Sequence, residues 1–140
     1  CDDNMVSARN MGMIAERHHK RLLQELANGF KVAPGYKRTR GGRQVLELRF
    51  DGVAGCLRTP EGGSSRQLLV LRKKDGKLAT RLLTVRETAR LMGAPGKYKI
   101  PGSYNDRYKA MGDAVAVPVV RHLATHLLLP IAEACGAFHA

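Results

Sequence analysis

LTVRETARLMG, residues 83–93, is the stretch that decides most about the fold of this chain. Thr84 and Glu87 stand at the spacing of a capping box. In that motif the threonine side chain accepts a hydrogen bond from the backbone three residues on, and the glutamate accepts one from the cap residue. The pair therefore predicts that a helix starts at Thr84. Ala89 and Met92 continue the stretch at helical spacing.

Two further helices are predicted after a connection rich in Gly and Pro at residues 93–103. A short helix is expected at about 105–111 and a longer one at 114–134. Pro118 falls in the first turn of the longer helix, where a missing N–H costs little, and Pro130 is expected to kink or end it. An apolar stripe at helical spacing is expected to be its buried face; the stripe consists of Val115, Val119, Leu123, Leu127 and Ile131.

Before residue 83 the pattern predicts one amphipathic helix and then short strands. The helix covers residues 11–30, with Gly29 as its C-cap. Residues 31–42 are expected to form a loop because Pro34, Gly35, Gly41 and Gly42 act as breakers. Strands are predicted at 44–50, 53–57, 67–72 and 78–83, with turns at Asp51-Gly52 and Asp75-Gly76.

The predicted fold class is therefore α+β, with a small antiparallel sheet flanked by an N-terminal helix and by C-terminal helices. Three segments are expected. Residues 1–30 form a helical segment, residues 31–83 form the sheet with basic loops, and residues 84–140 form a second helical segment.

Positive charge is concentrated in one third of the chain. The formal net charge is +12, and residues 31–77 contain twelve basic and four acidic residues. Such a stretch indicates a polyanionic partner, because Lys and Arg neutralise the phosphates of nucleic acids. On composition alone, a merely basic soluble protein is the alternative.

The segment RTPEGGSSRQ at residues 58–67 is the candidate DNA-reading loop within this basic third. Glycines let a backbone approach a groove closely, and Arg and Gln can read guanine and adenine edges. Serines can contact phosphates or bases. The candidate DNA-binding residues are Arg43, Arg58, Thr59, Gly62, Gly63, Ser64, Ser65, Arg66 and Gln67.

Other classes of function receive less support. No run of eighteen apolar residues occurs, so no membrane span is expected. Three cysteines without a Cys-x-x-Cys pair argue against a zinc site or a disulfide framework, and indicate a reducing compartment. His122 and His126 stand four apart, but Leu123 occupies the place of the glutamate that a metalloprotease helix needs. An ordinary helix face is therefore preferred to a metal site.

The 83–93 stretch, continued by Pro95, resembles motif IX of the DNA (cytosine-5)-methyltransferases. The string GDAV at 112–115 resembles motif X of the same family, and the 58–67 segment is similar to its target-recognition region. The resemblance covers roughly residues 36–134 and corresponds to the C-terminal third of the family.

This resemblance implies a role for each motif. The motif IX residues Thr84, Arg86, Glu87 and Arg90 would organise the recognition region against a Rossmann-like catalytic domain, and Arg86 and Arg90 are candidates to face phosphates. The motif X residues Gly112, Asp113, Ala114 and Val115 would contribute weakly to an S-adenosylmethionine pocket formed mainly by that domain. Asp113 replaces the usual Asn, and a carboxylate cannot donate the amide hydrogen bond.

The catalytic parts of that family do not occur in this sequence. None of the cysteines follows a proline, and neither a Glu-Asn-Val motif nor a Phe-x-Gly-x-Gly loop is present. We therefore expect no catalytic residue here, and no methylation of DNA by this chain alone.

The expected partners are double-stranded DNA and either a catalytic methyltransferase subunit or a second copy bound through the C-terminal helix. A cytoplasmic protein of prokaryotic or phage-like context is expected. The alternatives are a stand-alone DNA-binding module, an inactive methyltransferase remnant, and a basic α+β protein of unrelated function.

Overall fold

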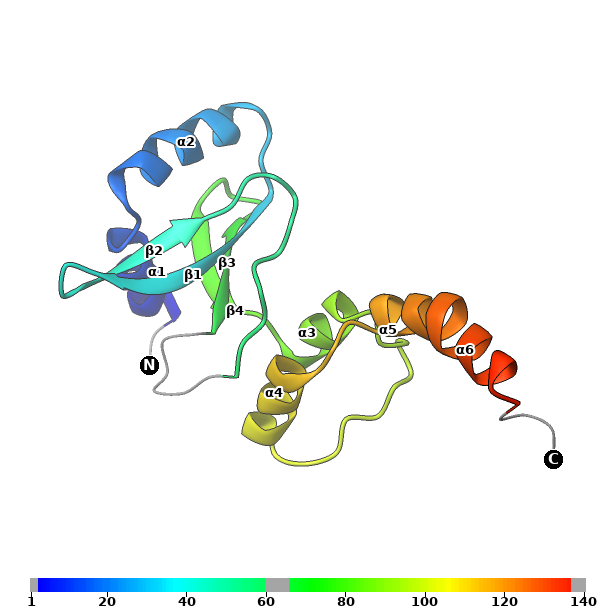
Figure 1. Ribbon diagram of the computed structural model, residues 1–140. Coiled ribbons are helices and arrows are strands. Elements are labelled where there is room, and N and C mark those ends of the chain that lie inside the picture. Colours follow the sequence, from blue (N-terminus) through cyan, green and yellow to red (C-terminus); the bar gives the residue numbers. More distant parts are fainter. Residues whose placement is uncertain (1–2, 60–65, 137–140) are drawn as a thin grey trace. The chain divides into compact units, whose positions relative to one another are not determined.

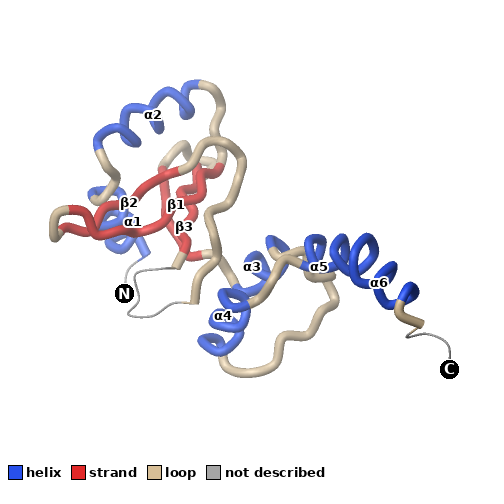
Figure 2. Tube along the Cα trace, in the orientation of Figure 1, coloured by secondary structure: helices blue, strands red, loops and turns tan. Residues whose placement is uncertain are grey.

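The computed structural model describes residues 3–59 and 66–136, so the predicted loop residues Gly62, Gly63, Ser64 and Ser65 lie outside the described part (Figure 1). The chain divides into two compact units, Cys1–Thr84 and Val85–Ala140. The first contains an antiparallel sheet with two helices, and the second is helical (Figure 2). The predicted α+β class is confirmed.

The sheet of the first unit has four strands in the order β2-β1-β3-β4, all antiparallel to their neighbours. The strands are β1 (Val32–Arg40), β2 (Arg43–Leu48), β3 (Gln67–Arg72) and β4 (Leu78–Leu82). The last two agree with the prediction, and Gly76 turns between them at a φ of 81°. That positive φ explains the Asp-Gly turn signal.

The loop predicted at residues 31–42 is wrong, because this segment forms β1, one of the two inner strands of the sheet. Gly41 and Gly42 adopt φ values of 53° and 75° and make the tight turn to β2. Gly35 is a close-approach position: a Cβ there would lie 2.7 Å from a methyl of Leu48 and 3.0 Å from the Glu47 carbonyl oxygen. The apparent breakers are therefore strand and turn residues.

The strand predicted at residues 53–57 is also wrong. This segment is an irregular coil, and Val53 is exposed. A hairpin at Asp51-Gly52 would pair this segment with the outer edge of β2, but residues 13–15 already hydrogen-bond to that edge at Leu46.

The single helix predicted at residues 11–30 is two helices, α1 (Asp3–Gly12) and α2 (Glu16–Ala27). Residues 13–15 separate them because they pair with the sheet: the Leu46 amide donates to the Met13 carbonyl, and the Ala15 amide donates to the Leu46 carbonyl. Gly29, at a φ of 84°, follows the end of α2 as predicted for a C-cap.

The hydrophobic core of this unit lies between α2 and one face of the sheet. Its fully buried members are Leu22 of α2 together with Leu46, Leu48, Leu68 and Val70 of the sheet. Helix α1 contacts the edge strand β4 through buried polar groups: Asn10 donates to the Thr80 hydroxyl at 2.8 Å, and the Thr80 amide donates to Ser7 Oγ at 3.0 Å. The other face of β1 and β2 is thus left for polar side chains.

The second unit begins with α3 (Val85–Leu91), directly after Thr84 as the capping box predicts. Helix α4 (Tyr104–Asp113) contacts α3 and starts with a capping box of its own, between Ser103 and Asp106. A continuous helical stretch follows, made of α5 (Val117–Leu123), the π-helical turn η1 (Ala124–Leu128) and α6 (Leu129–Ala134). Pro118 occupies the first turn of α5.

The helical stretch runs past Pro130, which was predicted to kink or end it. The wide turn η1 lies just before the proline, where a missing N–H would otherwise break the backbone ladder.

The apolar stripe of this last helix is not buried in the chain by itself, as expected of a face that packs on a partner. Its five residues are between 47% and 65% exposed. The stretch Tyr104–Ala134 is also long and apolar enough, by composition alone, to cross a membrane. One such helix is weak evidence for a membrane protein, because the helices of soluble proteins pass the same test. This exposure shows that the last helix carries a large apolar face, which no other described part of its own unit covers.

Candidate nucleic-acid interface

A basic cleft lies beside strand β1 of the first unit. It has a volume of about 550 Å³ and is formed by β1 and the coil after β2. Five of its lining residues are cationic: Lys37, Arg38, Arg40, Arg49 and Arg58. Tyr36, Thr39, Gly55 and Cys56 complete the lining. A cleft lined by one sign of charge concentrates ligands of the opposite sign.

The coil wall of the cleft is fixed by Gln67, the first residue of β3. This side chain is buried, and its Nε2 donates to the carbonyl oxygens of Gly55 at 2.6 Å and Cys56 at 3.0 Å. A Cβ on Gly55 would lie 3.3 Å from that amide nitrogen and 3.6 Å from the Tyr36 ring. The coil therefore lies against Tyr36 and Gln67, and a larger residue at position 55 would push it away.

A second interaction fixes the start of the same coil. Arg49 Nε donates to Asp51 Oδ1 at 3.2 Å, and Asp51 Oδ1 also accepts from the Val53 amide at 3.2 Å. The hydrogen bond from Arg49 is the main reason why the pKa of Asp51 falls to about 2. Asp51 therefore stays ionised at neutral pH and holds the Arg49 side chain beside the first residues of the coil.

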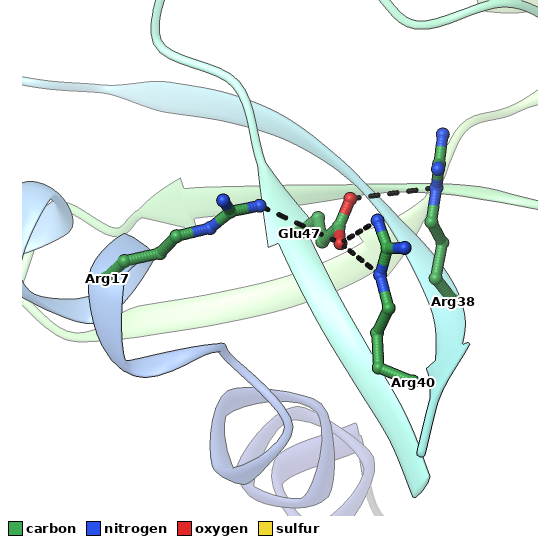
Figure 3. A network of polar contacts seen from close by, with 4 residues as sticks. All are labelled: Arg17, Arg38, Arg40 and Glu47. Atoms are coloured by element: carbon green, nitrogen blue, oxygen red, sulfur yellow. Dashed lines mark hydrogen bonds and ion pairs between the residues drawn. The ribbon is translucent and has the colours of Figure 1, made fainter. Parts of the chain in front are cut away.

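Three arginines converge on one buried carboxylate beside the cleft (Figure 3). Arg40 Nη2 and Nε lie 3.0 and 3.1 Å from Glu47 Oε1. Arg38 Nε lies 3.6 Å from Oε2, and Arg17 Nη2 lies 3.9 Å from Oε1. The Glu47 side chain is only 8% exposed, whereas the side chains of its three partners are between 49% and 73% exposed.

The strand register explains why this cluster forms. Glu47 pairs directly with Tyr36 across β1 and β2, and side chains on a strand alternate between faces. Tyr36, Arg38 and Arg40 therefore share the face of Glu47, opposite the core face. Burial raises the pKa of Glu47, but hydrogen bonds from Tyr36 and Arg40 and the charges of Arg40 and Arg38 outweigh it, so the pKa lies below its ordinary value of 4.5. The carboxylate is ionised.

In the second unit, a hydrogen bond connects the first of the two sequence motifs, residues 83–93, to the start of α5, just after the second, residues 112–115. Gly93 ends α3 in a Schellman motif, with the Gly93 amide donating to the Arg90 carbonyl and the Ala94 amide donating to the Ala89 carbonyl. The Val117 amide at the start of α5 donates to the Met92 carbonyl at 2.8 Å. The end of the 83–93 stretch is thus hydrogen-bonded to the helix that follows residues 112–115.

Arg86 holds the connection after α3. Its Nη1 donates to the carbonyl oxygens of Gly96 at 3.2 Å and Tyr98 at 2.8 Å. Arg90 is exposed on the same helix. Gly112 and Asp113 end α4, while Ala114 and Val115 belong to the extended link before α5.

No group of three or more potential metal-binding side chains occurs within residues 3–59 and 66–136. His122 and His126 stack with their ring centroids 4.3 Å apart, and His126 Nδ1 lies 3.0 Å from the His122 carbonyl oxygen. A main-chain hydrogen bond therefore occupies one of the four ring nitrogens of the pair.

Comparison with known protein families identifies the chain. The family model described as C-5 cytosine-specific DNA methylase matches residues 8–128. The chain belongs to this family. The resemblance inferred from residues 83–93 and 112–115 is confirmed.

Several cytosine-5 methylases share substantial identity with the chain. DNA (cytosine-5)-methyltransferase CMT2 of Oryza sativa subsp. japonica is 48% identical over 101 residues, which are 72% of this chain and 7% of that protein. The type II methyltransferase M.MspI of Moraxella sp is 41% identical over 58 residues, 41% of this chain and 14% of that protein. CMT2 of Arabidopsis thaliana is 34% identical over 106 residues, 73% of this chain and 8% of that protein. No solved structure matches the chain significantly.

The chain thus spans only a small part, 7% to 14%, of these cytosine-5 methylases. The relatives come from plants and from bacteria, so the predicted prokaryotic or phage-like context receives no support from them.

The predicted DNA-binding residues of this cytosine-5 methylase segment take different positions. Arg58 lines the cleft and Thr59 follows it directly. Arg43 faces Arg40 across the β1–β2 turn, and Arg66 precedes β3, half-buried. Gln67 is turned inward to the coil backbone.

Sequence reasoning missed Tyr36, Lys37, Arg38, Thr39, Arg40 and Arg49 as cleft residues. The signal that could have identified them is the basic run at 37–40. The loop prediction obscured it, because side chains are assigned to alternating faces only within a recognised strand. Lys37 lies on the face opposite Arg38, and its pKa is lowered by burial and by the charge of Arg9.

Proposed function

We propose that this chain is the DNA-recognition portion of a cytosine-5 DNA methyltransferase, in which the basic cleft of the first unit binds duplex DNA. The single observation that carries the proposal is that the four arginines Arg38, Arg40, Arg49 and Arg58 line one cleft of about 550 Å³. The cleft lies next to the segment that resembles the family's target-recognition region. Methyl transfer to cytosine then requires a catalytic half with the Pro-Cys nucleophile, supplied by another polypeptide or by sequence outside this chain.

The methyl donor S-adenosylmethionine would be bound mainly by that catalytic half. Asp113, Ala114 and Val115 are exposed, so a second surface has to cover them before they can help to enclose a ligand. The carboxylate of Asp113 can accept hydrogen bonds but cannot donate one. We therefore assign to Gly112–Val115 a minor role at the edge of the donor pocket, and no step of the reaction.

The exposed apolar face of α5, η1 and α6 would pack on the catalytic half. Val119, Leu123, Leu127 and Ile131 are each about half exposed, which is an unusual concentration of apolar surface for a free monomer. Self-association through the same face is the alternative. A monodisperse monomer in native mass measurement that also fails to bind a catalytic half would contradict both.

A stand-alone DNA-binding module or inactive remnant is the second candidate function. It is favoured by Asp113 and by the absence of a cysteine after a proline in the sequence. The intact motif IX stretch argues against decay, because its residues keep the hydrogen bonds that join α3 to α5.

DNA binding is tested by its dependence on salt. If about three phosphates are contacted, the affinity should fall about 40-fold between 50 and 200 mM salt. Arg58→Ala should weaken binding and flatten the salt dependence, whereas Lys97→Ala, which removes the same charge from an exposed loop of the second unit, should do neither. A flat salt response of the wild-type chain would overturn the proposal. Arg66→Ala should relax specificity if Arg66 reads a base, and weaken all sequences equally if it contacts a phosphate.

The need for a catalytic half is tested by reconstitution. The chain is mixed with the catalytic segment of a bacterial relative, and methyl transfer from labelled S-adenosylmethionine to duplex DNA is measured. Restored transfer would reject the remnant. Leu127→Glu on the apolar face should abolish methyl transfer without changing DNA affinity. The negative control is the same catalytic segment with its nucleophilic cysteine replaced by serine.

A further inference from the structure

Glu47 is the one acid at the centre of the arginine cluster, and the proposed function gives it no task. It lies beside a cleft that we assign to a polyanion, and it is ionised and almost fully buried. On charge alone, an acid in this place weakens the binding of DNA. An acid in this place has either a purely structural role or an effect on the arginines that outweighs the repulsion.

The geometry points to the second explanation. We propose that Glu47 is a positioning residue: it holds Arg38 and Arg40 against the wall of the cleft so that their remaining N–H groups bind one phosphodiester of duplex DNA. This inference rests on the proposed function, because it concerns the same cleft.

The hydrogen bonds leave donors available for that phosphate. A guanidinium has five N–H groups, and Arg40 commits only Nε and Nη2 to Glu47. Arg38 faces Glu47 through Nε alone, at 3.6 Å. Both residues line the cleft, and Arg guanidinium groups bind phosphates through paired N–H donors.

Fixing the two arginines beforehand lowers the cost of binding. A free arginine loses side-chain entropy when a ligand immobilises it, and prior positioning avoids part of that loss. Tyr36 supports the same cluster, because its ring centroid lies 4.7 Å from the Arg38 guanidinium carbon and it pairs directly with Glu47 in the strand register. Glu47 and Tyr36 therefore restrict where the Arg38 and Arg40 guanidinium groups lie before DNA binds.

Glu47→Gln separates the two explanations by the sign of its effect. The substitution removes a negative charge from beside the cleft, so charge alone predicts tighter binding. Positioning predicts binding about tenfold weaker, which corresponds to about 1.4 kcal/mol, and a salt slope shallower by about one phosphate. The probe is a labelled pool of random-sequence duplexes, titrated at several salt concentrations. The control is Glu25→Gln, which removes the same charge from a pair with Arg21 on α2, away from the cleft.

Arg38→Lys and Arg40→Lys keep the test available if Glu47→Gln does not fold. Both side chains are largely exposed, and lysine preserves the charge but lacks the paired donors. Each should weaken binding severalfold with the circular dichroism spectrum unchanged. The positioning role is overturned if both lysine variants bind with wild-type affinity. It is also overturned if Glu47→Gln binds as tightly as Glu25→Gln or more tightly. Neither result overturns the proposed function. Absence of salt-dependent binding by the wild-type chain overturns the proposed function instead.

Discussion

Replacing Gly93 by alanine should be the most damaging small substitution in the second unit. Gly93 has a φ of 77°, which a residue with a side chain adopts at a cost of about 1–2 kcal/mol. A Cβ at this position would also lie 2.5 Å from Pro118 Cδ and 2.9 Å from Pro118 Cγ. Relieving such an overlap in packed structure costs about 1–3 kcal/mol. Together the two effects predict a loss of about 2–5 kcal/mol.

The assay is urea unfolding of the full chain, combined with amide hydrogen exchange of α3 and α5 to assign the loss to the second unit. In the Gly93→Ala background, Pro118→Ala should restore the stability lost to the steric overlap, because alanine has neither of the two ring atoms. The loss of stability caused by the positive φ should remain. Gly96→Ala is the matched control: nothing lies within 4 Å of a Cβ there, so its effect should stay within about 0.5 kcal/mol. If Gly93→Ala were as stable as Gly96→Ala, the packing of Gly93 on Pro118 would be refuted.

Three further changes test the contacts that support the proposed site. Gln67→Leu should lower the free energy of unfolding by about 1–3 kcal/mol, because it leaves two coil carbonyls unpaired. Trypsin should then cut the coil faster. Gln44→Leu, at an exposed position, should not have this effect. Arg86→Ala should cost about 1 kcal/mol and speed hydrogen exchange in the loop after α3, compared with Arg90→Ala on the same helix. The folded pKa of Glu47 lies below 4.5, so its ionised form stabilises the first unit above pH 4.5. That contribution is lost as the pH falls from 4.5 through the folded pKa, and Glu47→Gln should remove this part of the acid dependence of the melting temperature.

The parts of the fold that depend on local signals were predictable from the sequence. The helix after Thr84, the strands β3 and β4, and the turn at Gly76 each follow from residues that are adjacent in the chain. A capping box or an Asp-Gly turn acts over four residues, so no knowledge of distant partners is required.

The inner strand β1 could not be predicted in this way. Pro34 and Gly35 normally disfavour strands, and their tolerance depends on what lies opposite. Gly35 faces Leu48 across the ladder, where there is no room for a side chain. The same dependence hid the cleft: Arg38 and Arg40 reach Glu47 only through the pairing of β1 with β2, so a loop prediction at 31–42 removed them from consideration.

The two units carry surfaces of opposite chemistry, and this separation gives the proposed function its internal test. The first unit presents a cationic cleft, and the second presents an apolar helix face. A polyanion gains little from the apolar face, and an apolar partner gains little from arginines whose desolvation is costly. Substitutions in the cleft should therefore change DNA affinity and its salt dependence while leaving association with a catalytic half intact, and Leu127→Glu should do the reverse. Equal effects of both kinds of variant on both measurements would mean that one surface serves both partners, and the division of labour inferred from charge and exposure would be wrong.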